Sequence, residues 1–170
     1  RTTAIKGLDQ ALHAIVLPAA DGIEHVYVAG ANDHAVAAFA FDRGSNALQH
    51  VGSYINNQNG VLGLADVEFL VASPDGEQVY ALSGSTGSVV QFNRDGLSGA
   101  LTFVARFGSG TLGGVQLNGV SSGVFDADGR FLYLTASTSN RLVQLARETA
   151  AGGSFGNLAL RTSVGQDEQG

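Results

Sequence analysis

The sequence predicts an all-β fold of β-propeller blades, namely three four-stranded antiparallel blades that form part of a larger propeller. The first reason is composition: 24 Gly among 170 residues, with 44% hydrophobic and 14% charged residues, favour short buried strands joined by tight turns. The second reason is a series of short runs rich in β-branched and aromatic residues. The third is an internal repeat that occurs three times along the chain.

The repeat is a constant order of turns and strands. An Asp-Gly turn is followed by an apolar residue and a Tyr, and these tyrosines are 53 residues apart: Tyr27, Tyr80 and Tyr133. The next runs also start 53 residues apart, at Ala35 ("AVAAFAFD"), Ser88 ("SVVQFNRD") and Arg141 ("RLVQLARE"). The Asp-Gly turns themselves are Asp21-Gly22, Asp75-Gly76 and Asp128-Gly129. Chance similarity does not explain several landmarks in one order.

Each repeat contains four strand-like runs, which in the second copy span 67–73, 78–83, 88–93 and 101–107. The first run, "VEFLVAS", is nearly all apolar and predicts a strand buried on both faces, while the fourth predicts an outer edge. The turn "SPDG" between the first two runs predicts a hairpin with a structural role for its Asp. Four antiparallel strands per 40–50 residues are typical of a propeller blade, and the predicted blades are 7–55, 61–107 and 115–164.

The pattern "SPDG…VY…SVVQFNRD…GALTFV" resembles the blade repeat of lactonase-type propellers related to 6-phosphogluconolactonase. The resemblance runs from about Gly7 to Val164. It implies a closed ring, seven-bladed in that family, and lactone hydrolysis as one activity. Blades of this type also occur in proteins without enzymatic function, and no residue of this chain matches a catalytic motif of the family closely enough to be transferred.

Three blades leave two radial sheet faces uncovered, because closed propellers need about four to eight blades. Uncovered faces rich in Val, Leu and Phe predict an interface. We therefore expect the remaining propeller blades as partner, supplied by the same polypeptide, a cleaved fragment or a second copy of the chain. The chain opens on Arg1 and not Met, which agrees with a piece of something longer.

Three local motifs match known site patterns without the required context. "GVSSG" (119–123) matches a nucleophile elbow, and "GSGTLG" (108–113) matches a dinucleotide loop, but each needs a helix that the following residues do not predict. "DADG" (126–129) resembles the start of a calcium loop without its later ligands, and it aligns with "SPDG". We interpret all three as turns or strand starts.

Histidines and carboxylates provide the remaining candidates for chemistry. His13 and His25 lie on neighbouring strands of the first blade, close enough to be considered as a metal pair, but we expect packed or surface positions for the histidines. Asp66 and Glu68 flank one inner strand and form the best acidic pair. The catalytic candidates are Asp66, Glu68 and His34, any of which has the chemistry of a general base. No metal site and no cofactor is predicted.

Strand direction places the loops 30–35, 83–88 and 136–141 and the connections 56–66 and 108–119 on one rim, around the channel mouth. Loops on a rigid scaffold commonly hold ligand and partner sites. The alternative is that these loops are ordinary polar turns. The candidate rim residues for a protein or small-molecule ligand are Asn32, Asp33, His34, Asn57, Asn59, Asn118, Asn140 and Arg141.

Charge and hydropathy exclude some partners. A net charge of −6 with scattered Arg argues against nucleic acid, and no run is apolar enough for a membrane span. The absence of Cys leaves the compartment open, and a secreted or cell-surface location is favoured.

The first functional hypothesis is a non-enzymatic binding or structural module that completes a ring with other blades. The alternative is a lactone hydrolase, and a redox or cofactor-binding propeller comes third.

Overall fold

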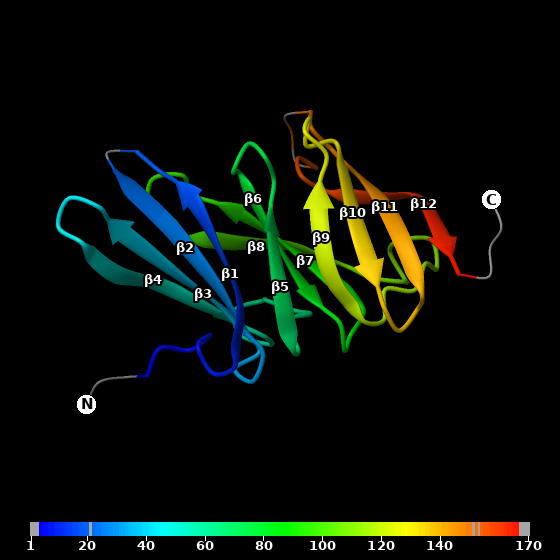
Figure 1. Ribbon diagram of the computed structural model, residues 1–170, viewed down its shortest axis with the longest axis horizontal. Coiled ribbons are helices and arrows are strands. Elements are labelled where there is room, and N and C mark those ends of the chain that lie inside the picture. Colours follow the sequence, from blue (N-terminus) through cyan, green and yellow to red (C-terminus); the bar gives the residue numbers. More distant parts are fainter. Residues whose placement is uncertain (1–3, 21, 151, 153, 167–170) are drawn as a thin grey trace.

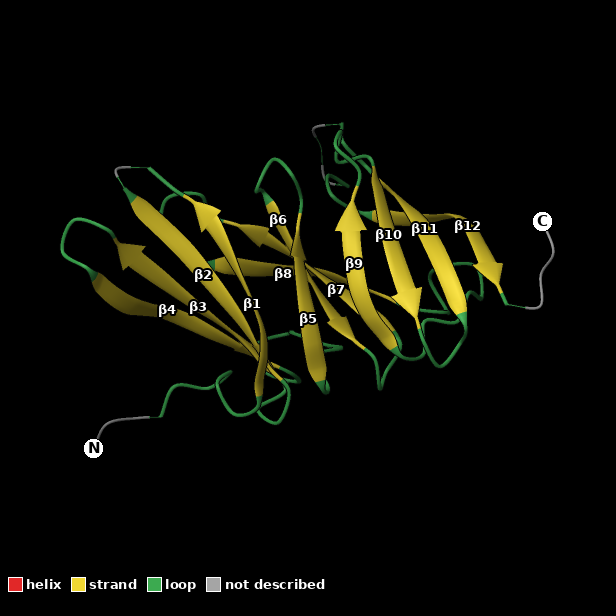
Figure 2. Cartoon of the chain, in the orientation of Figure 1, coloured by secondary structure: helices red, strands yellow, loops and turns green. Residues whose placement is uncertain are grey.

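The computed structural model describes residues 4–20, 22–150, 152 and 154–166, and their strands form three four-stranded antiparallel sheets. Within this described part there is no helix (Figure 2). The first sheet holds β1 (Ala11–Pro18), β2 (Ile23–Gly30), β3 (Ala35–Asp42) and β4 (Ala47–Ile55). The second holds β5 (Val67–Ala72), β6 (Gln78–Ser83), β7 (Ser88–Arg94) and β8 (Leu101–Phe107). The third holds β9 (Val120–Phe125), β10 (Phe131–Ala136), β11 (Arg141–Arg147) and β12 (Leu158–Gly165).

In every sheet the strands follow one another in sequence order, and each pairs antiparallel with the next. The three sheets stand in a row, and neighbouring sheets approach through their first two strands, since β5 contacts β1 and β2 and β9 contacts β5 and β6 (Figure 1). First strands gathered on one side and fourth strands splayed outward are the geometry of radial propeller blades. The predicted all-β propeller fold is confirmed.

Burial within a blade differs from the prediction in one respect. All six residues of β6 are buried, whereas β5 exposes Glu68 and only half-buries three other residues. The second and third strands of the middle sheet are therefore its most deeply buried strands, because they lie between the two neighbouring sheets. The first strand faces the centre of the ring, so its apolar run does not make it the deepest strand.

In the hairpin turn between β5 and β6, Asp75 has the predicted structural role. Its carboxylate accepts hydrogen bonds from the Ser73 hydroxyl at 2.5 Å and from the Glu77 amide at 3.1 Å. Gly76 adopts a φ of +71°, which few residues other than Gly tolerate. The corresponding Asp21 lies outside the described residues.

The core of the molecule lies between blades and not within them. The first, second and third sheets are blades 1, 2 and 3. One cluster of buried apolar side chains joins blades 1 and 2, and a second joins blades 2 and 3. A tyrosine hydroxyl crosses each interface: Tyr27 donates to the Gly99 carbonyl at 2.9 Å and Tyr80 to the Gly156 carbonyl at 2.6 Å. Burial raises the pKa of Tyr27 to about 12, so the phenol remains a donor at neutral pH.

An arginine also reaches back across each interface. Arg94 of blade 2 donates to His25 of blade 1, and to the Pro18 carbonyl at 2.7 Å. Burial, together with the Arg94 guanidinium, lowers the pKa of His25, which keeps its ring neutral and able to accept. Arg147 of blade 3 repeats this contact with Gln78 and Asp75 of blade 2. Apolar burial thus supplies the stabilisation, and the polar contacts fix how adjacent blades align.

Removing one interblade hydroxyl tests this arrangement. We expect Tyr80→Phe to lower the free energy of unfolding by about 1–3 kcal/mol, because the buried Gly156 carbonyl loses its donor. Urea denaturation at one protein concentration measures the change. The control is Leu97→Ala, since Leu97 is 84% exposed and its loss should cost less than about 0.5 kcal/mol. Equal effects of the two substitutions would contradict the importance of the bond.

Candidate functional site

The candidate site is the rim formed by the loops after β2, β6 and β10 and by the connections between blades, along the lower edge of Figure 1. Backbone hydrogen bonds tie these segments together across blades. The Gly119 amide donates to the Gly84 carbonyl at 2.9 Å, and the Ser137 amide donates to the Gly119 carbonyl at 3.0 Å. The rim is therefore a continuous, hydrogen-bonded surface on which side chains are held in fixed positions.

In each sheet, the residue directly before the first, inner strand (β1, β5 or β9) has a left-handed backbone. These residues are Gln10 (φ 52°), Asp66 (φ 50°) and Gly119 (φ 73°). Such a φ is uncommon for residues other than Gly, and strained backbone is often found at functional sites. Asp66 is thus placed at the start of β5 by a conformation that every blade repeats.

A β-bulge follows the left-handed residue in all three inner strands. In β5 the register shifts between Val67 and Phe69, which leaves Glu68 without a residue opposite it on β6. The equivalent bulge residues are Leu12 in β1 and Ser121 in β9, and all three are exposed. Bulges redirect side chains, and this one exposes Glu68 two residues after Asp66 on the strand nearest the ring centre.

The structure brings two of the predicted catalytic candidates together. The Asp66 amide donates to Nδ1 of His34 at 2.9 Å, and the Asp66 carboxylate lies 3.3 Å from the same nitrogen. The side chains of His34 and Asp66 are 46% and 51% exposed, respectively, so both are open to solvent. Because Nδ1 accepts from an amide, the proton of the neutral ring is on Nε2. His34 thereby keeps an N–H donor on Nε2, the ring nitrogen that does not face Asp66.

The contacts of Asp33 indicate a structural role and not a catalytic one. Its side chain is 6% exposed, forms an ion pair with Lys6 at 2.9 Å, and accepts from the amides of Gly7, Leu8 and Asp9. The Lys6 hydrogen bond, with the amide hydrogen bonds, lowers the pKa of Asp33 to about 2. Asn32 joins the same group by donating to Asp9 at 3.3 Å. These two rim residues hold the N-terminal segment against the first blade.

The remaining rim candidates have no described side-chain contact with the His34–Asp66 pair, and their described contacts lie in turns or outer strands. Asn57, Asn59 and Asn140 have left-handed φ values of 61°, 49° and 50°, which Asn tolerates well. The Asn118 carbonyl accepts from the Ser139 amide at 3.1 Å, and Arg141 donates to the Ser163 hydroxyl at 3.1 Å.

His13 and His25 do not approach each other, in agreement with the default expectation of packed or surface histidines. His13 is opposite Ala29 and His25 is opposite Leu17 in the β1–β2 register. His13 stacks on Phe69 with ring centroids 3.9 Å apart, whereas His25 contacts Arg94 at the other end of the blade interface. Nowhere in the described ranges do three or more His, Cys, Asp or Glu side chains gather as a metal site.

The three local motifs have the structures that their context predicts. Ser121 of "GVSSG" lies in β9, which continues to Phe125 without a helix, so no nucleophile elbow forms. "GSGTLG" is a run of turns after β8. Asp126 of "DADG" caps a turn by accepting from the amides of Arg130 and Phe131 at 2.8 and 3.0 Å.

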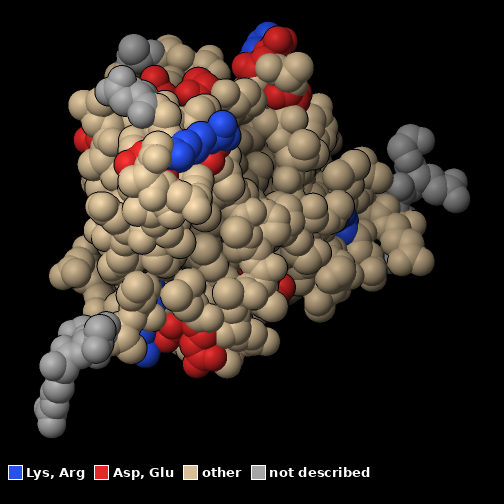
Figure 3. Space-filling model, turned by 60° about the vertical axis from the view of Figure 1, so that its left-hand side comes forward, with Lys and Arg blue, Asp and Glu red and all other residues tan. Residues whose placement is uncertain are grey.

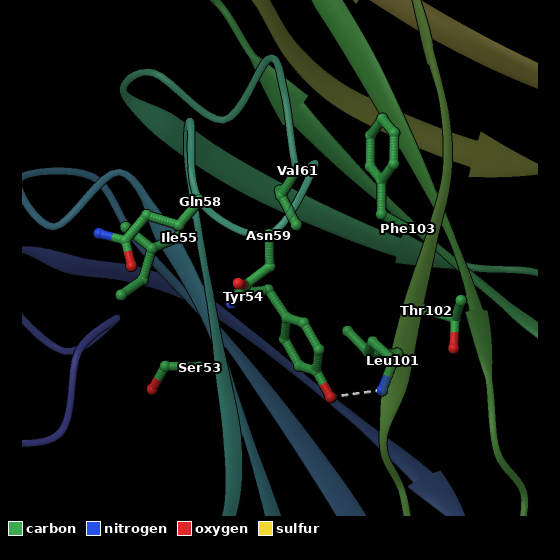
Figure 4. A pocket seen from close by; sticks show the side chains of 9 residues that line it. All are labelled: Ser53, Tyr54, Ile55, Gln58, Asn59, Val61, Leu101, Thr102 and Phe103. Carbon is green, nitrogen blue, oxygen red and sulfur yellow. Dashed lines mark hydrogen bonds between the residues drawn. The ribbon is translucent and has the colours of Figure 1, made fainter.

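Sequence reasoning missed a cavity of about 280 Å³ between the outer strands β4 and β8 (Figure 4). Tyr54 points across it, and its hydroxyl accepts from the Leu101 amide. The cavity contains no carboxylate, imidazole or amine, so it lacks a group for proton transfer at neutral pH. Its lining residues are Ser53, Tyr54, Ile55, Gln58, Asn59, Val61, Leu101, Thr102 and Phe103. The one sequence signal for this cavity is the aromatic Tyr54 in a strand that was predicted to be an outer edge.

Comparison with solved structures identifies the type of propeller. The periplasmic gluconolactonase PpgL of Pseudomonas aeruginosa is similar over 89% of this chain, with 26% identity and a TM-score of 0.70. The fold is that of a lactonase-type β-propeller. A Bacteroides fragilis protein with a provisional 6-phosphogluconolactonase assignment matches 86% of the chain at 18% identity and a TM-score of 0.66. The β-propeller domain of Cps50 (Swd1) from Myceliophteria thermophila matches 91% at 12% identity and a TM-score of 0.58.

The chain covers 39% of PpgL and 36% of the Bacteroides protein, and so spans less than half of these propellers. No protein-family model and no curated protein sequence matches the chain. Among the described residues, none belongs to a helix of the length and apolar character needed to cross a bilayer.

The Asp33 network predicts a pH dependence of stability. Its folded pKa of about 2 lies below the unfolded value of about 3.9, so its contribution is complete above pH 4 and is lost as the pH falls towards 2. We expect Asp33→Asn to lower the thermal midpoint at pH 7 and to flatten its decline between pH 4 and 2. Calorimetry over that range, with exposed Glu77→Gln as the control, measures this. A variant whose decline matches the wild type would contradict the prediction.

Proposed function

We propose that this chain is part of a lactonase-type propeller that hydrolyses a sugar lactone, with the His34–Asp66 pair at the rim of the channel. The observation that supports the proposal is the pair itself: a solvent-open carboxylate and an imidazole N–H donor on the ring side of a propeller similar to PpgL. These comparisons favour the hydrolase over the non-enzymatic module, which was the first hypothesis from the sequence.

Lactone hydrolysis needs a base, a donor for the developing oxyanion and a proton for the leaving alkoxide. In the proposed mechanism the Asp66 carboxylate takes a proton from water as its oxygen attacks the lactone carbonyl carbon. The Nε2–H of His34 donates a hydrogen bond to the oxyanion that forms. The ring C–O bond then breaks, and the alkoxide takes the proton from Asp66, so the net reaction adds one water and gives a hydroxy acid.

Glu68 is the competing base, because its bulge exposes it on the same inner strand. Two features favour Asp66. Asp66 is directly hydrogen-bonded to His34 through its own amide, which fixes base and donor relative to each other. Its left-handed backbone also limits where the carboxylate can lie. Glu68 is the longer and less constrained side chain, so we assign it a role in contacting substrate hydroxyls.

Rates of proton release from glucono-1,5-lactone and from 6-phosphogluconolactone at fixed pH test the proposal. We expect a rate above the spontaneous reaction, a loss of about 100-fold or more with Asp66→Asn, and a loss of about 100-fold with His34→Gln. Glu68→Gln should raise KM with little change in kcat. Measurements use the chain alone and the chain with the blades that complete its ring.

The matched control is Glu77→Gln, an exposed carboxylate on the β5–β6 turn at the opposite rim, which should leave the rate unchanged. Spontaneous rates in every preparation, or full activity in Asp66→Asn, would contradict the assignment. Activity lost only with Glu68→Gln would move the general base to that residue.

A further inference from the structure

The cavity between the outer strands β4 and β8 is enclosed by blades 1 and 2, which the chain supplies in full. Its volume of about 280 Å³ is near the lower end of the range for small-molecule sites. Val61 and Leu101 are buried in its wall, whereas Gln58, Asn59 and Thr102 are exposed. The cavity therefore has room for one small ring-shaped molecule and opens to solvent beside its polar residues.

The aromatic part of the wall is held in place from behind. Phe92 of β7 is fully buried, and its ring centroid lies 5.7 Å from that of Tyr54 and 6.1 Å from that of Phe103. The Tyr54 hydroxyl accepts from the Leu101 amide, which fixes the ring across the cavity (Figure 4). Burial raises the pKa of Tyr54, so the hydroxyl keeps its proton at neutral pH and is able to donate it to a ligand.

The polar side chains of the cavity have hydrogen-bonding capacity that the protein does not use. Within the described part of the chain, the side chains of Gln58, Asn59 and Thr102 form no hydrogen bond with other protein groups. A carboxamide offers donors and an acceptor, and a hydroxyl both donates and accepts. These groups are complementary to the hydroxyl groups of a ligand, which also donate and accept.

The interface between blades 2 and 3 has an apolar side chain at the corresponding place. Leu112 follows Asn59 by the repeat length of 53 residues, is 1% exposed and belongs to the core between those two blades. Phe107 follows Tyr54 by the same interval and belongs to the same core. A buried Leu stabilises such an interface, whereas Asn59 leaves this stabilisation unused. The repeat therefore does not require a polar cavity here.

The fourth strands differ in the same direction. Thr102 and Phe103 of β8 pair with β7 in the register in which Ala159 and Leu160 of β12 pair with β11. A hydroxyl and an aromatic ring beside the cavity thus correspond to two aliphatic side chains in the next blade. Polar and aromatic groups gather at the first interface alone of the two that the chain contains.

Charge plays no part in the wall of the cavity. None of its nine lining residues, all within the described ranges, carries a charge at neutral pH. Figure 3 turns the side of the molecule with blade 1 forward and shows a broad surface free of Lys, Arg, Asp and Glu, with charged side chains towards its upper and lower edges. A phosphate or carboxylate on a ligand would find no cation in the cavity to offset its desolvation. The lining therefore favours a neutral ligand.

We propose that the cavity between β4 and β8 binds one neutral sugar ring of the hexopyranose class. The C–H face of such a ring packs on the aromatic side chains, and its hydroxyls bond with the amide and hydroxyl side chains of the wall. A free monosaccharide and the terminal residue of a glycan share this chemistry. Sugar binding at these outer strands is independent of the hydrolysis proposed at the rim, and neither requires the other.

Saturation-transfer difference NMR on the intact protein tests the site with D-glucose, D-galactose and D-mannose as probes. We expect a signal from at least one of them with a millimolar Kd, strongest on the C–H protons of one ring face, because these protons lie on the aromatic side chains. Lactose separates the two sources. Saturation of one lactose ring indicates the terminal residue of a glycan, and binding of monosaccharides alone indicates a free sugar.

Three substitutions remove the proposed contacts. Asn59→Gly deletes the amide and suits the left-handed φ of 49°, while Thr102→Ala and Phe103→Leu each introduce the small or aliphatic residue of the next repeat. We expect each to raise the Kd by about 5-fold or more. The matched control is Gln49→Ala, an exposed carboxamide on β4 outside the cavity, which should leave the Kd unchanged. Circular dichroism confirms that each variant is folded.

Two results would overturn the proposal: no signal from any of the three hexoses, or an unchanged Kd in both Asn59→Gly and Phe103→Leu. A Kd raised by Asp66→Asn and not by the cavity variants would overturn it as well, because the sugar would then bind at the rim. We expect Asp66→Asn to keep the sugar affinity while it loses lactone hydrolysis, so failure of one proposal is distinguishable from failure of the other. Tighter binding of D-glucuronate than of D-glucose would contradict the neutral ligand class.

Discussion

The structure depends on the burial of each sheet's apolar face against the next sheet. Within one blade the strands satisfy their own backbone hydrogen bonds, but both faces of β6 and β7 are apolar and need cover. A fully buried Leu or Phe contributes about 1.5–3 kcal/mol, and both core clusters draw their members from two adjacent blades. Blades 1 and 3 cover the middle one, while their own outer faces remain available to a partner.

The packing of adjacent blades also determines the structure of the rim. When blades pack side by side, the connection that leaves one blade lies against a loop of the next. The first strand of each blade then starts from a left-handed residue, which is followed by a bulge. Where that residue is Gly119 the feature is only structural. Where it is Asp66, the repeat holds a carboxylate beside His34. The proposed base thus lies at a position whose left-handed backbone is repeated in every blade.

The sequence predicted the repeat, the four-stranded blades and the structural role of Asp75, because these depend on local turn residues and on a spacing of 53 residues that is visible in one dimension. It also named His34, Asp66 and Glu68. It could not predict that β6 is more buried than β5, since that depends on which strand faces the ring centre. It left the partners of His13 and His25 open, because a bulge and the register set them. The cavity beside Tyr54 arises between blades and has no local signature.

The central claim is that adjacent blades, and not the strands of a single blade, provide the stabilising core. The most direct measurement is circular dichroism with amide hydrogen exchange on an isolated peptide of residues 61–107, compared with the same residues in the whole chain. We predict a disordered peptide whose amides exchange at unprotected rates, while the amides of β6 and β7 are strongly protected in the chain. A folded peptide with protected β6 and β7 amides would contradict the account.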